Sequence, residues 1–403
     1  MSDYLHGVEI LEGEPQAILE AGDTAVIGLV GTAPQGAVNE AKLITSADAA
    51  LKEYGQDITG FTIPASLATI FNKVAAKVVV VNVLTAEKAA ALLTPKSKAR
   101  SAAEIADTHI YEATLPEEVD YTKELVAGLE KLLTIDDKLG VKPNIILAPG
   151  YSQLQAVMSK MLTVAEKLEG FAVIDIVAAD VQAALTARSS GTFNITNQAG
   201  VLCYPQMYRF NEHKGTNDLM GLSVYWARSK AIRDAESGYW FSPSNTELDD
   251  VAGLNAEVTS SLTDASAATN LLNGQGIVTV FRKSGMGTRL WGNWTAAYPS
   301  AKTTECMIAP RAVRMAIREA LVNASITYMD KNATSVMVDN VTGDVNDFLR
   351  TLKGQGAIKD GKCTYNPDKN PATQVAQGKM VFSFSVTFSP SLERITFEEE
   401  IEY

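Results

Sequence analysis

The residues that most often carry chemistry in proteins are few in this chain and lie far apart. Its three histidines and three cysteines are His6, His109, His213, Cys203, Cys306 and Cys363. Zinc and redox sites are marked by Cys or His at short, paired spacings, and none of these residues has such a neighbour. A His-based catalytic triad is equally unsupported. We therefore expect no metal, no cofactor and no catalytic site, and we interpret the cysteines as buried or incidental thiols of a reducing cytoplasm.

Two glycine-rich stretches have the residue types that hold phosphate groups, but not the spacing. Residues 27–36, IGLVGTAPQG, lack the G-x-G of a dinucleotide-binding turn. Gly285 and Gly287 are followed by neither a helix at the right distance nor a Lys-Ser/Thr pair. Both stretches are typical of turns. One alternative stays open, namely an α/β enzyme or nucleotide-binding protein with its site at the strand ends near Gly31 or Gly150.

Four glutamates near residue 400 have the chemistry of a cation site. They are Glu398, Glu399, Glu400 and Glu402. Successive residues of a strand point to opposite faces, so such a run cannot converge on one ion without a loop. We interpret these glutamates as a strand edge that resists wrong pairing until the correct neighbour arrives.

Three arginines are expected along one side of a helix that begins near residue 310. At 100° per residue, Arg311, Arg314 and Arg318 fall within about 60° of one another. Val313 and Ile317 lie on another face of the same helix. The arginine stripe is either a docking surface for an acidic partner or a solvated helix face, and the spacing alone does not separate the two.

Composition narrows the class of protein. The chain has 403 residues, of which 46% are hydrophobic and 20% charged, and its formal net charge is −12. A nucleic-acid surface needs clustered Lys and Arg, so the acidic balance argues against a nucleic-acid partner and favours solubility. No apolar run approaches the roughly 20 residues of a membrane span, and the first residues lack the pattern of a signal peptide. We expect no membrane insertion. We also expect a protein that assembles with other subunits and whose acidic charge prevents nonspecific aggregation.

Strand and helix patterns alternate from about residue 25 to residue 240. Residues 25–34 and 78–84 are typical of buried strands, and residues 46–54 of a helix that Ser46 caps. Further strands are expected at 142–150, 171–178 and 200–210, with helices between them. Such alternation predicts a mostly parallel sheet flanked by helices.

The stretch GYWFSPSN, residues 238–245, is rich in aromatic and turn residues and marks a change of character. We place the boundary to a second, α+β domain there. Its expected elements are the segment 277–296, a helix over 310–329, a strand over 335–341, a helix over 345–356 and a closing strand from 380. Trp291, Trp294 and Tyr298 could form a ligand-stacking platform, but we interpret them as core or subunit-interface aromatics, because no acid, base or nucleophile converges near them.

Both ends of the chain have the alternation of strands with one apolar face. The apolar residues are Phe382, Phe384, Val386 and Phe388 in the closing strand, Ile395, Phe397, Ile401 and Tyr403 after it, and Tyr4, Val8 and Ile10 near the start. Pro390 separates the two C-terminal runs, and Glu399 is the misfit in the second. A strand at the end of the sequence has no following element to fold back on, so we expect its partner to be another copy of the protein.

The energetics of such an arm require an apolar face. The thirteen residues 391–403 reach roughly 40 Å when extended, enough to enter a neighbouring subunit. Ordering them costs about 1 to 2 kcal/mol per residue, whereas each ladder hydrogen bond returns only about 1 kcal/mol net. Burial of apolar side chains at roughly 1.5 to 3 kcal/mol each supplies the difference. A head-to-tail exchange that does not close on itself generates an open helix.

Four stretches carry a resemblance to a known family. They are MSDYLHGVEILE at 1–12, GYWFSPSN at 238–245, RLWGNWT at 289–295 and FSFSVTFSPSLERITFE at 382–398. The chain resembles the tail sheath proteins of contractile-tailed phages and of related contractile particles such as R-type bacteriocins. The last three stretches follow one another in the order and at roughly the spacing expected of that family.

The resemblance implies a structural protein and no enzyme. Sheath proteins polymerise as stacked hexameric rings around a rigid tail tube, and the assembled helix contracts to drive that tube through a bacterial envelope. The implied partners are other copies of the chain, the tail tube protein, and the baseplate and tail terminator proteins. The subunit would be assembled in the host cytoplasm as part of a virion tail and would belong to an extracellular particle after release.

The resemblance also implies a domain plan, an α/β outer domain inserted into an α+β core domain with extended N- and C-terminal β arms. The expected bounds are 1–20 for the N-terminal arm, 21–124 and 125–240 for the two parts of the outer domain, 241–390 for the inner core domain, and 391–403 for the C-terminal arm. Arms of neighbouring subunits insert into the sheet of a third subunit's core domain, where 382–388 would be the acceptor strand. The inner domain faces the tube, and Arg311, Arg314 and Arg318 would lie on its tube-facing helix.

Overall fold

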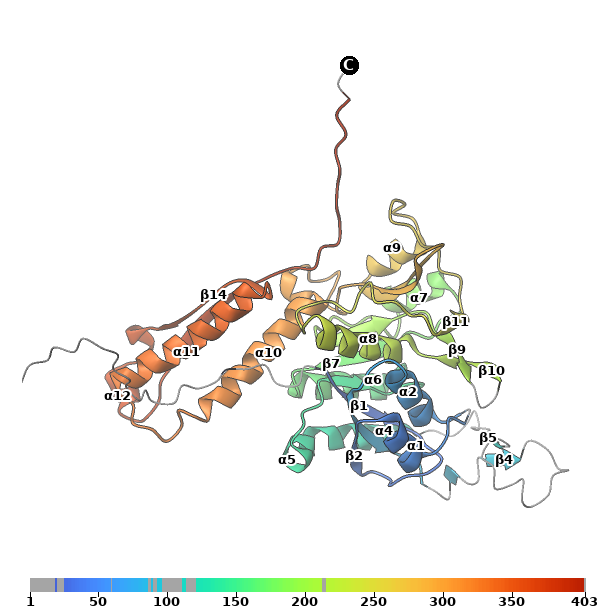
Figure 1. The fold of residues 1–403 in the computed structure, drawn as a ribbon, viewed down its shortest axis with the longest axis horizontal. Coiled ribbons are helices and arrows are strands. Elements are labelled where there is room, and N and C mark those ends of the chain that lie inside the picture. Colours follow the sequence, from blue (N-terminus) through green and yellow to red (C-terminus); the bar gives the residue numbers. More distant parts are fainter. Residues whose placement is uncertain are drawn as a thin grey trace, which may run out of the picture. The chain divides into compact units, whose positions relative to one another are not determined.

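The computed structural model describes residues 19, 25–58, 60–85, 88–89, 93–95, 111–113, 121–211 and 215–401. Contacts within the chain divide it into two compact units, and Figure 1 labels many of their elements. The large unit is Asp23–Met315 together with Pro390–Tyr403, and the small unit is Met1–Gly22 together with Ala316–Ser389.

An eight-stranded sheet forms the centre of the large unit. In sheet order its strands are β13 (Gly287–Trp291), β12 (Ile277–Lys283), β8 (Gly200–Cys203), β7 (Phe171–Asp175), β6 (Ile145–Leu147), β1 (Val26–Gly31), β3 (Lys77–Asn82) and β2 (Ala41–Ile44). The strands from β12 to β3 pair in parallel, and the antiparallel strands β13 and β2 lie at the two edges.

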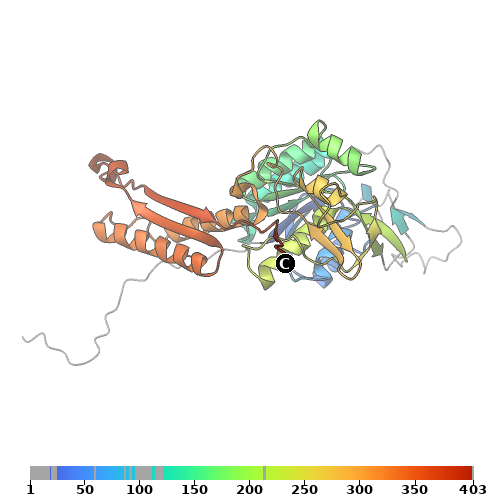
Figure 2. The same cartoon turned by 90° about the horizontal axis from the view of Figure 1, so that it is seen from above.

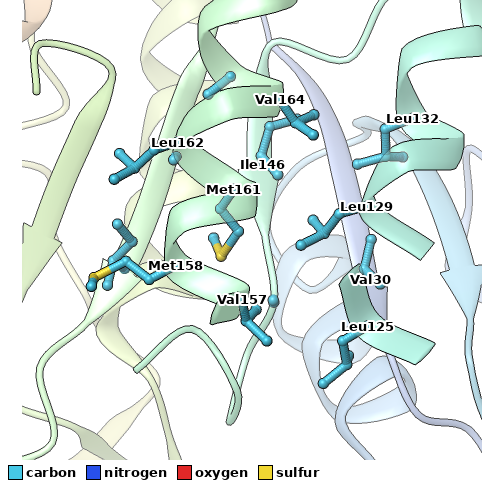
Figure 3. Packing of buried hydrophobic residues seen from close by; sticks show 14 of the residues in the cluster. Val30, Leu125, Leu129, Leu132, Ile146, Val157, Met158, Met161, Leu162 and Val164 are labelled. Carbon is cyan, nitrogen blue, oxygen red and sulfur yellow. The ribbon is translucent and has the colours of Figure 1, made fainter. Parts of the chain in front are cut away.

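Helices cover both faces of this sheet. They are α1 (Ala47–Tyr54), α2 (Thr62–Phe71), α4 (Thr122–Lys131), α5 (Ile135–Leu139), α6 (Gln155–Lys167), α7 (Val181–Ser189), α8 (Leu222–Glu236) and α9 (Ala268–Asn273). Alternate residues of a strand point to opposite faces, so in β3 Val79 and Val81 pack with α4 and α6, and Val78 and Val80 pack with α2 and α8. Figure 3 shows the first of these cores, where Met161 of α6 lies among side chains of α4 and the sheet.

Smaller strand groups and short helices complete the large unit. β9 (Met207–Asn211) lies between β10 (Thr216–Met220) and β11 (Val251–Leu254) in an antiparallel sheet. β4 (Leu93–Pro95) and β5 (Tyr111–Ala113) form an antiparallel pair. The 3-10 turns of this unit are Leu132–Thr134 and Thr304–Cys306.

The described residues of the small unit form long helices and one strand pair, which can be followed in orange and red in Figure 2. Its elements are the end of α10 (Ile308–Ser325), α11 (Ser335–Gly354), β14 (Ile358–Tyr365), the 3-10 turn Pro367–Lys369, α12 (Ala372–Val375) and β15 (Phe382–Phe388). β14 and β15 pair antiparallel, and α11 packs on β14 through the buried side chains of Val345, Phe348, Leu349 and Leu352.

Much of the predicted element pattern is confirmed. Ser46 caps α1, because its Oγ accepts a hydrogen bond from the N–H of Ala49 at 3.2 Å. The buried strands β1, β3 and β7 lie where the apolar runs predicted them, and the helix predicted over 310–329 is α10. The predicted strand over 200–210 is two strands, β8 and β9, in different sheets, because Pro205 between them offers no N–H to a continuous ladder.

The predicted domain boundary after residue 240 is wrong. β12 and β13 belong to the eight-stranded sheet, and the contacts divide the chain at Ala316 instead. The predicted parts 21–124 and 125–240 likewise share that one sheet. A hairpin with one buried strand has the same pattern whether it starts a new sheet or extends an old one, and here the pairing of β12 with β8 decides.

The predicted strand over 335–341 is also wrong, because these residues form the first two turns of α11. The valines favoured a strand. Two helix signals prevail over them: Thr334 Oγ1 accepts a hydrogen bond from Met337 N–H at 3.2 Å, and Val338, Val341 and Val345 recur at helical spacing.

A buried carboxylate joins β7 to α8. Asp175 Oδ1 accepts from the N–H of Ser223 at 2.8 Å and its Oδ2 accepts from the Ser223 hydroxyl at 2.6 Å, so Asp175 caps a helix whose own cap residue, Gly221, has no side chain. A Cβ at Gly221 would lie 2.1 Å from Asp175 Oδ2, which explains the glycine. Burial raises the pKa of Asp175 to about 6, although both hydrogen bonds oppose that shift.

This raised pKa predicts a pH-dependent stability. Between pH 4 and 6 the folded state binds a proton at Asp175 that the unfolded state has released, so the contribution of this group to stability falls as pH rises through that window. We expect the wild type to lose on the order of 2 to 3 kcal/mol more than Asp175→Asn between pH 4 and 6.5. Urea unfolding of both proteins measures the difference. Asp137→Asn, at an exposed position, is the control and should follow the wild type; equal pH slopes for wild type and Asp175→Asn would contradict the account.

Candidate assembly surface

The strand pair of the small unit presents a half-covered apolar face. Residues opposite each other in an antiparallel pair share a face, and Phe384 lies opposite Cys363 while Val386 lies opposite Gly361. A Cβ at Gly361 would lie 3.3 Å from Leu349, so this face is the one that α11 covers. The cover is complete over β14, where Cys363 is buried, and incomplete over β15.

The predicted acceptor residues are therefore only partly buried. Phe382, Val386 and Phe388 are half-buried, and Phe384 is 44% exposed. β15 pairs with β14 on one side, and within the described part of the chain no strand pairs with its other side. An open backbone edge beside uncovered apolar side chains is a site at which another strand can add.

The C-terminal arm, residues 390–401, is extended and makes no strand ladder within the described residues (Figure 1). Its apolar side chains are uncovered, with exposed fractions of 63% for Ile395, 89% for Phe397 and 65% for Ile401. Apolar residues at this spacing in an extended chain need a partner surface. The predicted arm residues Tyr4, Val8, Ile10 and Tyr403 lie outside the described residues.

The base of the arm is held by the large unit. Glu393 Oε2 accepts a hydrogen bond from the indole N–H of Trp294 at 2.9 Å, and its Oε1 accepts one from the Asn293 side chain at 3.3 Å. Trp294 stacks on Tyr298 with ring centroids 4.4 Å apart. No pattern in the sequence singles out Glu393, although the indole N–H of Trp294 needs a hydrogen-bond acceptor.

The arginine stripe is not a single exposed surface. Arg311 is 8% exposed, donates to the carbonyl of Gly170 at 3.1 Å and lies 5.6 Å from the ring centroid of Phe171, so the prediction that it faces a partner is wrong. Packing of the first turn of α10 against the large unit overrides the angular pattern. Arg314 is partly exposed and lies 3.5 Å from Glu305, and Arg318 is exposed. These two arginines stay a prediction.

The described residues give no support to the alternative ligand site at the strand ends near Gly31 and Gly150. Thr32 N–H donates to Thr62 Oγ1 at 3.1 Å and Thr62 N–H donates to Thr32 Oγ1 at 3.3 Å, and the Tyr151 hydroxyl lies 3.4 Å from Thr32 Oγ1. These side chains bond to one another at the strand ends, the region where open α/β sheets bind ligands. Among the residues that the structure describes, no cluster of His, Cys, Asp or Glu is arranged to hold a metal ion.

Helix lengths and hydropathy bear on a membrane role. Within the described ranges, no helix combines the length and the apolar composition that crossing a membrane requires.

The sequence matches three family profiles along its length. They are the phage tail sheath protein central domain over residues 119–296, the tail sheath protein Gp18 domain III N-terminal region over 24–83, and the phage tail sheath C-terminal domain over 308–402. The tail sheath protein of Burkholderia phage BcepMu is 31% identical, with 99% of this chain and 97% of that protein covered. The tail sheath protein of Escherichia phage P2 is 25% identical, with 100% and 96% covered.

Solved structures show the same fold. The helical sheath of the anti-feeding prophage in its contracted state matches with a TM-score of 0.68 at 17% identity, over 99% of both chains. The sheath complex of the PVC extracellular contractile injection system, also contracted, matches with a TM-score of 0.68 at 15% identity, over 100% of this chain and 99% of that one.

Fold, surface and relatives together define a structural protein that assembles with copies of itself, and no enzyme. The chain belongs to the phage tail sheath protein family. It is a structural subunit of a contractile tail sheath and a component of a virion or particle tail, as the resemblance predicted.

The contact between Glu393 and Trp294 predicts how firmly the arm base is held. Trp294→Phe keeps a ring that stacks on Tyr298 but removes the N–H donor, and it leaves the sequence around Arg394 unchanged. A hydrogen bond to a carboxylate is worth about 1 kcal/mol or more, so we expect trypsin to cleave after Arg394 about fivefold faster in the monomer. Trp291→Phe is the matched control, because Trp291 packs on Phe281 in the sheet. Equal cleavage rates in the two variants would contradict the anchor.

Proposed function

We propose that the sheath polymer is held together by strand exchange, in which the C-terminal arm of one copy pairs with the outer edge of β15 of another. One observation carries the proposal. The small unit has an open strand edge beside half-exposed Phe384, and the same chain has an arm whose Ile395, Phe397 and Ile401 are uncovered. The open strand edge and the uncovered apolar arm are each unfavourable alone. Pairing the arm with the edge gives the edge a strand and gives the apolar side chains a surface.

The energetics favour exchange over two separate exposed surfaces. Each apolar side chain of the arm gains about 1.5 to 3 kcal/mol when it is buried, and these gains offset the roughly 1 to 2 kcal/mol per residue that ordering the arm costs. The anchor at Glu393 reduces that cost, because residues near it are already held. An exchange that passes from copy to copy without closing gives an open helical array.

The wider assembly in this proposal is a stack of hexameric rings around a tail tube, attached to baseplate and terminator proteins and assembled in the host cytoplasm. Contraction would then drive the tube through a bacterial envelope. The energy would come from two alternative packings of the same subunits, with the extended packing metastable. Similar solved structures support this proposal, because one is of a helical sheath in the contracted state and another is of a baseplate.

The two compact units have different places in this proposal. The large α/β unit is the outer domain, inserted in sequence between the segments of a small core domain. The small unit and α10 would lie nearer the tube, and the exposed side of α10 that carries Arg314 and Arg318 would contact an acidic tube surface. Strand exchange by the N-terminal arm, with Tyr4, Val8 and Ile10, is part of the same proposal.

The arm proposal predicts that only one face of the arm matters for assembly. Ile395→Ser combined with Phe397→Ser removes two buried contacts of about 1.5 to 3 kcal/mol each, so we expect at least about a hundredfold weaker association and no tubes. Thr396→Ala combined with Glu398→Ala truncates the other face and should leave tubes unchanged. Sedimentation and negative-stain microscopy measure both variants. Tubes of normal length from the Ile395/Phe397 variant would sink the proposal.

The tube contact predicts a separable effect. Arg314→Glu with Arg318→Glu should abolish loading of the sheath onto purified tail tubes, because the reversed charges repel an acidic surface. Self-assembly without tubes should persist. Arg350→Glu is the control, since Arg350 is an exposed arginine of α11, in the unit that also holds Arg318. Normal loading by the Arg314/Arg318 variant, measured by co-sedimentation with tubes, would contradict this contact.

A further inference from the structure

We propose that helix α11 closes the outer edge of β14, so that the strand pair of the small unit accepts an added strand only along β15. The occupant of the β15 edge is the C-terminal arm of a second copy, and the inference rests on the strand exchange proposed above. Nothing in the apolar pattern of the two strands distinguishes their edges. The distinction comes from polar side chains that bond to the backbone of β14.

The first of these side chains is Asn346 of α11. Its Oδ1 accepts a hydrogen bond from the N–H of Cys363 at 2.7 Å, and its Nδ2 donates to the carbonyl of Cys363 at 3.1 Å. A residue of a neighbouring strand would make this same pair of bonds. Asn346 therefore occupies the position of a third strand, and an arm could pair there only by displacing it.

The second closure lies two residues away. Lys353 of α11 donates a hydrogen bond to Asp360 Oδ1 at 2.8 Å, next to Gly361 in the chain. The Lys353 hydrogen bond and charge lower the pKa of Asp360. A charged pair at a strand edge is a recognised obstacle to further pairing. Gly361 and Cys363 are alternate residues of one strand, so both closures act on the same edge.

The edge of β15 has the opposite character. The backbone groups of Cys363 point to Asn346, so Cys363 and its partner Phe384 are a non-hydrogen-bonded pair of the antiparallel ladder. In such a pair, the N–H and C=O groups of each residue point away from the partner strand. The backbone groups of Phe384 and Val386 therefore face outward. Asn370 bonds to the N–H and C=O of Val381. Val381 lies three residues before Phe384, so its backbone groups point to the opposite side of the chain, which is the side that faces β14. The outer side of β15 keeps no strand partner within the described residues.

The surroundings of the two edges agree with this assignment. A groove of about 650 Å³ runs between α11 and β14, and its lining includes Asp339, Thr342, Asp347 and Lys362. The arm offers the apolar side chains of Ile395, Phe397 and Ile401, which match the partly exposed phenylalanines of β15. In this proposal each copy offers one open edge, that of β15, to the arms of other copies. Any second arm that joins the same sheet must add outside the first, which gives every copy the same strand order.

Disulfide cross-linking in the assembled full chain tests the edge assignment. Lys362 and Ser385 are direct partners on the face away from α11 and both are exposed, so they report on the two edges at equal depth. Cysteine is introduced at Thr396 or Glu398 of the arm together with either Ser385→Cys or Lys362→Cys. A disulfide needs Cα atoms about 4.4 to 6.8 Å apart, which adjacent strands satisfy, whereas strands two positions apart lie about 10 Å from each other. The native thiols are buried, and mass spectrometry assigns each link.

We expect about tenfold more linkage between copies through residue 385 than through residue 362. Adding Asn346→Ala should open the second edge and raise linkage through residue 362 by a similar factor. Equal linkage through 362 and 385 without the Asn346 change would overturn the edge assignment while leaving strand exchange in place. No linkage through either residue would instead overturn the proposed exchange itself. Unchanged linkage through 362 in a folded Asn346→Ala variant would overturn the role of Asn346; if that variant does not fold, the comparison of 385 with 362 still decides.

Discussion

Among the described residues, β15 pairs with a strand along one edge and has no strand along its other edge. The arrangement of the other elements of the small unit depends on this difference between the two edges. β14, β15 and the helix α11 that covers them bury too little apolar surface to form a complete core, since an isolated strand pair is only marginally stable in water. The half-exposed Phe384 and its neighbours are the surface of an incomplete core. α11 secures β14 by packing on its face and by bonding its edge, so the incompleteness is confined to a single edge.

The large unit has a different physical character. Its sheet is covered on both faces, and antiparallel strands lie at the two edges, so its stability does not call for another copy. It contributes the anchor that Trp294 and Asn293 provide for Glu393, from which the arm extends. In the proposed polymer a rigid body therefore holds the arm at its base, while the apolar residues beyond it stay available to a neighbour.

The sequence was sufficient wherever one local signal decided the outcome. The run of valines in β3, the Ser46 cap of α1 and the apolar stripe of α10 each predicted the observed element. It was insufficient wherever a non-local contact decided. The pairing of β12 with β8, the helix through 335–341 and the burial of Arg311 each depend on what lies opposite in space. Asn346 and Glu393 left no recognisable pattern, because a polar side chain that bonds a distant backbone or indole looks like any surface residue.

Electron cryomicroscopy of the assembled sheath at a resolution that separates strands tests the central claim most directly. We expect residues 394–401 of one copy to form a strand along the outer edge of β15 of another copy. Ile395 and Phe397 should lie on the face that α11 covers, and Asn346 should still be bonded to Cys363. A map in which the arm folds onto its own copy, or in which the β15 edge is unfilled, would contradict it.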